Sequence, residues 1–90
     1  MYRILIVDDE KIERNGIKFL LKRAGIECEI AEAANGKDAL EYIKNNEIDI
    51  LLTDVKMPFM DGIELIENVV GLKQNIKYVI FSGLGVSFCR

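Results

Sequence analysis

Carboxylates that follow two separate apolar runs are the residues of this sequence best suited to chemistry. Asp8, Asp9 and Glu10 directly follow the apolar residues 4–7, and Asp54 directly follows a second apolar run. Ionised carboxylates that converge repel one another unless a cation lies between them. The sequence contains no histidine and offers oxygen ligands at these positions, so the cation we expect is Mg²⁺.

An acidic pair after a strand also has a simpler interpretation. Asp8 or Asp9 fits the N-cap of a following helix, where a side-chain oxygen accepts a backbone N–H and the helix dipole favours negative charge. The position of Asp54 favours the interpretation as a metal site. Asp54 is followed by a loop of restricted conformation that contains the single proline, Pro58, and an Asp61-Gly62 turn.

The carboxylates converge if the elements that carry them are neighbours in one sheet. Four runs rich in β-branched residues predict strands at residues 4–7, 28–33, 48–52 and 78–81. Amphipathic stretches between them predict helices at residues 10–24, 37–44 and 62–70. Strand and helix alternate, which predicts a parallel sheet of the α/β class. Ligands of such sheets bind at the carboxyl ends of the strands, where Asp8, Asp9 and Asp54 stand.

The spacing of apolar residues also predicts the buried faces. In residues 10–24 one helical face holds Ile12, Ile17, Leu20, Leu21 and Ala24. In residues 62–70 the buried residues are expected to be Ile63, Ile66, Val69 and Val70. Residues 27–32 alternate between polar and apolar side chains, which is typical of an edge strand.

Length and composition exclude several classes of protein. A chain of 90 residues, half of them hydrophobic and 30% charged, is typical of one soluble globular domain. The net charge of −3 argues against direct nucleic-acid binding by this fragment. No apolar run is long enough to span a membrane, and Cys28 and Cys89 fit a reducing compartment. We therefore expect a cytoplasmic protein without membrane contact.

Three motifs together resemble the receiver domain of bacterial two-component response regulators. They are Asp-Asp-Glu after the first strand, Asp-Val-Lys-Met-Pro-x-Met-Asp-Gly after the third and Phe-Ser-Gly after the fourth. The resemblance covers residues 1–83 and implies a flavodoxin-like, doubly wound parallel sheet of order 2-1-3-4. The sheet is expected to be incomplete, with four of the family's five strands, and residues 84–90 to form a tail outside the family.

The resemblance also implies a function, that of a phosphoacceptor rather than a turnover enzyme. Asp54 would take a phosphoryl group from a phosphohistidine on a sensor histidine kinase. Mg²⁺ would be held directly by Asp9 and Asp54, through water by Asp8, and by the backbone carbonyl of Lys56. Ser82 resembles the family's switch hydroxyl, although a serine before a glycine is also an ordinary turn residue. The intact protein looks similar to transcription regulators with an AraC-type DNA-binding domain.

The sequence departs from the family after its fourth strand. No lysine follows Lys77, so the lysine that pairs with the phosphoaspartate in the family has no counterpart, nor has the aromatic switch residue. We therefore expect phosphorylated Asp54 to be read out poorly. Residues 78–81 would have a bare edge. The alternating Leu84, Val86 and Phe88 predict that the tail pairs with the fourth strand or with a second chain, which would give a homo-oligomer, unless the tail is disordered.

Other functions are weighed against phosphotransfer. The main alternative is a phosphotransfer-impaired, self-associating interaction module, a dimer that keeps the receiver fold. A hydrolase with an aspartate nucleophile on the first strand needs Asp-x-Asp, which Asp8-Asp9-Glu10 lacks. Nucleotide-binding enzymes are disfavoured because no Gly-x-x-x-x-Gly-Lys or Gly-x-Gly-x-x-Gly segment follows any predicted strand.

Overall fold

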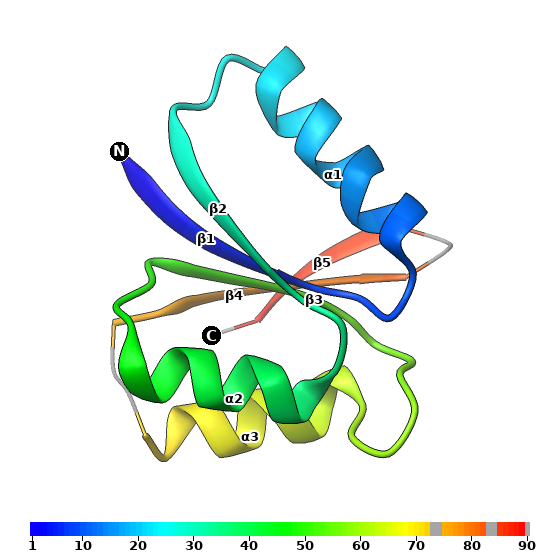
Figure 1. The fold of residues 1–90 in the computed structure, drawn as a ribbon, viewed down its shortest axis with the longest axis vertical. Helices are drawn as coiled ribbons and strands as arrows, with labels where there is room; N and C mark the ends of the chain where they lie inside the picture. Colours follow the sequence, from blue (N-terminus) through cyan, green and yellow to red (C-terminus); the bar gives the residue numbers. More distant parts are fainter. Residues whose placement is uncertain (73–74, 83–84, 90) are drawn as a thin grey trace.

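A central β-sheet with helices on both faces makes up the chain (Figure 1). The structure, a computed structural model, describes residues 1–72, 75–82 and 85–89, the last range without its side chains. The strands are β1 (Tyr2–Val7), β2 (Cys28–Ala33), β3 (Ile50–Asp54), β4 (Lys77–Ser82) and β5 (Gly85–Cys89). The helices are α1 (Lys11–Arg23), α2 (Gly36–Asn45) and α3 (Gly62–Val70). In the described ranges no helix is long and apolar enough to cross a lipid bilayer.

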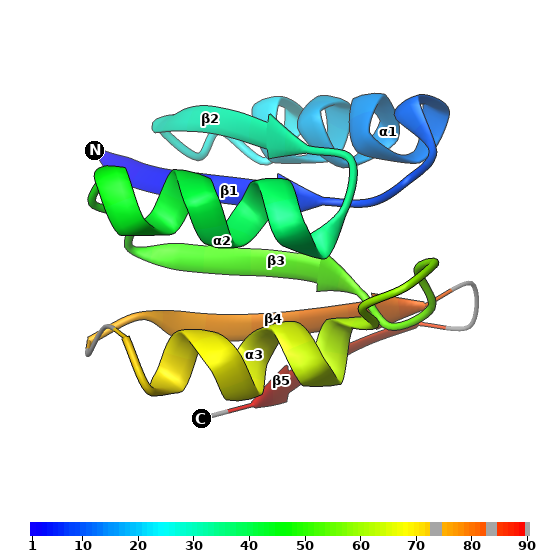
Figure 2. The ribbon, with the colours of Figure 1, turned by 60° about the horizontal axis from the view of Figure 1, so that its bottom comes forward.

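The strands β1 to β4 run parallel in the order β2-β1-β3-β4, which confirms the predicted topology (Figure 2). The strand β2 lies at one edge, as its alternating sequence indicates. Because β1 and β3 are neighbours, with Val7 opposite Thr53, the residues after them leave the sheet side by side. This adjacency places the acidic residues of both segments at one edge of the sheet.

The tail forms a fifth strand. The strand β5 pairs antiparallel with β4, with Ser82 opposite Gly85 and Tyr78 opposite Cys89. Pairing with the fourth strand, one of the two arrangements predicted for the tail, is therefore confirmed. The prediction of a bare β4 edge is wrong, because the same chain forms hydrogen bonds along it.

The main hydrophobic core lies between the sheet and the helices α2 and α3, which share one face (Figure 1). The helix α3 buries Leu65 and Val69 completely. Ile63 and Val70 were expected in the core but are 46% and 55% exposed. Apolar residues surround most of this helix, so their spacing alone does not decide which face turns inward.

The helix α1 lies on the opposite face of the sheet from α2 and α3 (Figure 1). It buries none of its residues, and its apolar Ile12, Phe19 and Leu20 are 84%, 60% and 63% exposed. A groove between α1 and β4 is lined by Ile17, Leu20, Leu21, Ala24, Ile26, Leu52, Val79, Phe81 and Ser82. The apolar face predicted for this helix is thus present but poorly covered.

The difference between the two faces can be measured with a pair of truncations. We expect Leu65→Ala to lower the free energy of unfolding by about 2 to 5 kcal/mol, because the side chain is fully buried. Leu20→Ala should cost less than about 1 kcal/mol, because most of that side chain is already in water. Urea denaturation followed by circular dichroism gives both values, and equal losses would contradict this description of the core.

Candidate metal centre

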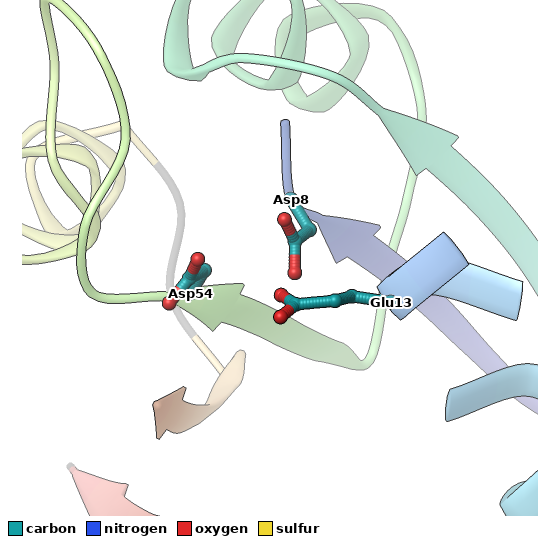
Figure 3. Close-up of side chains that lie close together, drawn as sticks. All are labelled: Asp8, Glu13 and Asp54. Atoms are coloured by element: carbon teal, nitrogen blue, oxygen red, sulfur yellow. The ribbon is translucent and has the colours of Figure 1, made fainter. Parts of the chain in front are cut away.

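Three carboxylates from three elements meet at the carboxyl edge of the sheet (Figure 3). Asp8 follows β1, Asp54 ends β3, and Glu13 lies in the first turn of α1. One carboxylate oxygen from each residue lies within 4.8 Å of those from the other two. In Figure 3 the side chains of Asp8 and Glu13 point toward each other, with Asp54 beside them.

Asp8 is fully buried and incompletely hydrogen-bonded. Its Oδ1 accepts the backbone N–H of Glu10 at 2.9 Å, whereas its Oδ2 is buried without a hydrogen-bond partner. Burial raises the pKa of Asp8 to about 7, and the neighbouring Glu13 carboxyl acts in the same direction. A buried carboxylate oxygen without a partner is costly, so this atom needs either a proton or a cation.

Asp54 is partly buried in the same cluster. Burial raises its pKa above the ordinary value, and the neighbouring charges of Asp8 and Asp9 raise it further. Backbone N–H groups of Lys56 and Val55 act in the opposite direction, because they stabilise the carboxylate. The carboxylate form of Asp54 is therefore favoured by two backbone amides and disfavoured by burial and by the neighbouring acidic groups.

The loop after β3 fixes the backbone that carries Asp54. The Gly62 N–H donates to the Val55 carbonyl at 2.8 Å, and a Cβ at Gly62 would overlap the Asp54 carbonyl oxygen. The Asp61 side chain accepts the Glu64 N–H at 2.8 Å and the Glu64 side chain accepts the Asp61 N–H at 3.5 Å. This capping box starts α3, so the predicted Asp-Gly turn is the N-terminus of that helix.

Arg14 holds the connection between β1 and α1. Its Nη1 donates to the Asp8 carbonyl at 2.6 Å, and its Nε contacts Glu32 at 2.9 Å. Lys18 contacts the same glutamate at 2.8 Å. These two cations lower the pKa of Glu32, and their charged groups are engaged there rather than with the acidic cluster.

The other predicted site residues line a hollow in the surface beside Asp54. Its lining is Asp9, Glu10, Glu13, Asp54, Val55, Lys56 and Ser82. Asp9 is exposed and lies outside the tight cluster of three, and Ser82 stands at the end of β4. Sequence reasoning missed Glu13. The available signal was an acidic residue in the first turn of the helix that directly follows the acidic run.

Comparisons with known proteins agree with this geometry. Residues 4–88 match the family model described as the response regulator receiver domain. The uncharacterized transcriptional regulatory protein YesN of Bacillus subtilis is 38% identical over 86 residues, which are 94% of this chain and 23% of YesN. The chemotaxis protein CheY of Thermotoga maritima is 37% identical over 83 residues, which are 92% of this chain and 68% of CheY.

A solved structure shows the same fold. A two-component transcriptional regulator AraC from Clostridium phytofermentans has a TM-score of 0.83 and 38% identity, covering 92% of this chain and 68% of that one. The parallel strands β1 to β4 and the acidic residues at their carboxyl edge agree with these similarities. The chain belongs to the response regulator receiver domain family.

Membership of the family defines the general role of the site. Receiver domains are signalling modules rather than enzymes in themselves, and they bind Mg²⁺ at an acidic pocket. The cluster of Asp8, Glu13 and Asp54 is an acidic group of this kind. Its oxygen-only donors and the buried, unpartnered Asp8 oxygen fit a hard divalent cation. The predicted division of the chain at residue 83 stays a prediction.

The raised pKa of Asp8 predicts an unusual pH dependence of stability in metal-free buffer. Between the ordinary aspartate pKa and about 7, the folded state binds more protons than the unfolded state, so its stability should fall as the pH rises through 7. Urea denaturation from pH 5 to pH 8 should show this fall. Asp8→Asn should flatten it, and adding Mg²⁺ at pH 8 should restore stability to the unmodified chain. A flat profile for the unmodified chain would contradict the assignment.

Proposed function

We propose that this domain accepts a phosphoryl group on Asp54 from a sensor histidine kinase, with Mg²⁺ as cofactor. The observation that carries the proposal is the position of Asp54 at the end of β3, beside a buried Asp8 whose Oδ2 has no hydrogen-bond partner. A phosphoryl acceptor needs an exposed oxygen in a pocket that can hold a cation. Asp54 is partly exposed and lines a hollow together with Asp9, Glu10 and Glu13, which supports the proposal.

In the proposed reaction an Asp54 oxygen forms a bond to phosphorus as the bond from phosphorus to the donor nitrogen breaks. The backbone N–H groups of Lys56 and Val55 favour the carboxylate form of Asp54, the form that attacks phosphorus. Mg²⁺, when bound, offsets the charge that accumulates on the transferring oxygens. The residues proposed to hold it are Asp9 and Asp54 directly, Asp8 through water, and the Lys56 carbonyl.

Ser82 is the proposed switch hydroxyl. It ends β4 and lines the hollow that contains Asp54. A hydroxyl in this position can donate a hydrogen bond to a phosphoryl oxygen on Asp54, which would shift the end of β4 toward the site. Since β5 pairs with Ser82 through Gly85, such a shift would also move the start of β5.

Relatives suggest the partners. The autoinducer 1 sensor kinase/phosphatase LuxN of Vibrio campbellii is 34% identical over 80 residues, which are 9% of that protein. This similarity supports a sensor kinase as the donor. The similarity to YesN and to the AraC-type regulator supports a role in transcription regulation within a longer protein. With a net charge of −3, this segment is not expected to bind DNA itself.

The phosphoacceptor can be identified by intact mass. We expect the protein incubated with Mg²⁺ and phosphoramidate to gain one phosphoryl group, and Asp54→Asn to gain none. Asp49→Asn makes the same chemical change at an exposed aspartate that pairs with Arg3, so it should keep the gain. A phosphoryl gain that survives Asp54→Asn would refute Asp54 as the acceptor.

A second candidate function, self-association, is favoured by the surface of the chain. Folded monomers of 10.2 kDa expose about 5,300 Å² on the scaling for compact proteins, whereas this chain exposes 6074 Å². The excess is close to the area of about 800 Å² that each partner buries in a standard interface. The exposed Phe19 and Leu20 of α1 and the groove beside them form an apolar surface. The proposed occupant is α1 of a second copy.

Self-association through α1 is testable by sedimentation. We expect the unmodified chain to dimerise at high concentration, and Leu20→Glu to be monomeric because a charge would enter the apolar groove. Lys22→Gln changes the net charge by the same amount on the opposite side of α1 and should leave the dimer intact. A monomeric unmodified chain would contradict the interface and leave the groove to other segments of a longer protein.

A further inference from the structure

We propose that Glu13 is an additional carboxylate ligand of the divalent cation in this site. The inference rests on the proposed function, because it concerns the same metal centre. It goes beyond that function by adding a residue from α1 to a site otherwise built from the segments after β1 and β3. It also makes the site more anionic than the motif residues alone would.

The geometry places Glu13 within reach of the shared ion. Its carboxylate oxygen lies within 4.8 Å of oxygens from both Asp8 and Asp54. Ligands around an octahedral Mg²⁺ are separated by about 3 to 4 Å, since each lies about 2.1 Å from the ion. Glu13 is exposed and belongs to the first helical turn, so a small side-chain rotation closes the remaining gap.

A second observation points to a ligand at this place. The Oδ2 of Asp8 is buried and has no hydrogen-bond partner, although the rest of that residue is bound by backbone groups and Arg14. In Figure 3 the Asp8 carboxylate is directed toward that of Glu13. A cation bound beside the two carboxylates, with a water ligand donating to the Asp8 oxygen, would satisfy that oxygen and reduce the repulsion between them.

The surrounding charges leave the cluster without compensation from nearby side chains. Among the residues that line the hollow, four are acidic and Lys56 is basic. Two basic residues of α1, Arg14 and Lys18, contact Glu32 instead. None of the ion pairs found among the described residues involves Asp8, Glu13 or Asp54, and a divalent ion is the species that this set of oxygens fits.

A competing explanation is that Glu13 only shares a hydrogen bond with Asp8 and takes no part in binding the ion. The two explanations predict opposite effects of Glu13→Gln. If Glu13 is a ligand, its loss weakens Mg²⁺ binding. If Glu13 competes with the ion for Asp8, its loss leaves binding unchanged or makes it tighter.

The test is a titration of the isotope-labelled protein with MgCl₂ at pH 8 and constant ionic strength, followed by the backbone amide NMR signals. Loss of a metal-site ligand typically weakens binding by about 10-fold or more, and we expect this for Glu13→Gln. Glu10→Gln is the matched control. Glu10 lines the same hollow, its side chain caps no N–H of α1, and it lies outside the cluster. Because salt at physiological concentration screens the charge of Glu10, Glu10→Gln should change the Mg²⁺ affinity by no more than about 2-fold.

The outcomes separate this inference from the proposed function. Unchanged or tighter binding by Glu13→Gln, with normal binding by the unmodified chain, would overturn the role of Glu13 alone. Equal losses of Mg²⁺ affinity in Glu13→Gln and Glu10→Gln would indicate general attraction of the cation by negative charge. This result would also overturn the role of Glu13. Absence of binding by the unmodified chain would reject the Mg²⁺ site as a whole. Circular dichroism of both variants checks that these exposed substitutions leave the fold intact.

Discussion

Repulsion among carboxylates at one edge of the sheet is the constraint on which the rest of this structure depends. Asp8 is fully buried with one oxygen unpartnered, and Asp54 and Glu13 present further oxygens within 4.8 Å. A domain with little stability to spare tolerates such a cluster when something positive occupies it. The proposed Mg²⁺ site, the phosphoacceptor role and the contribution of Glu13 all follow from this one electrostatic requirement.

The fold produces the cluster through a few backbone contacts. The parallel pairing of β1 with β3 brings the residues after both strands together. The close approach of Gly62 to the Asp54 carbonyl and the capping box at Asp61 fix the loop on one side. Arg14 ties the Asp8 carbonyl to Glu32 on β2 on the other side. The site is therefore held by the edge of the sheet rather than by the weakly packed α1 as a whole.

Sequence predicted the sheet and the places of Asp8 and Asp54 at strand ends well because both depend on local patterns. Apolar runs and helical spacing place the elements, and strand ends place Asp8 and Asp54. Which face of α3 turns inward depends on the loop that starts it, and so Ile63 was misplaced. Glu13 was missed because its approach to Asp54 is a tertiary contact. The covered β4 edge depends on pairing that the sequence left open between two partners.

The most direct test of the central claim is anomalous diffraction from crystals grown with MnCl₂, since Mn²⁺ accepts the same oxygen ligands as Mg²⁺. We predict one strong anomalous peak at the carboxyl edge of the sheet, within coordination distance of the Asp54 carboxylate and next to Asp8. A fully occupied manganese site elsewhere, with no peak among these carboxylates, would contradict the account.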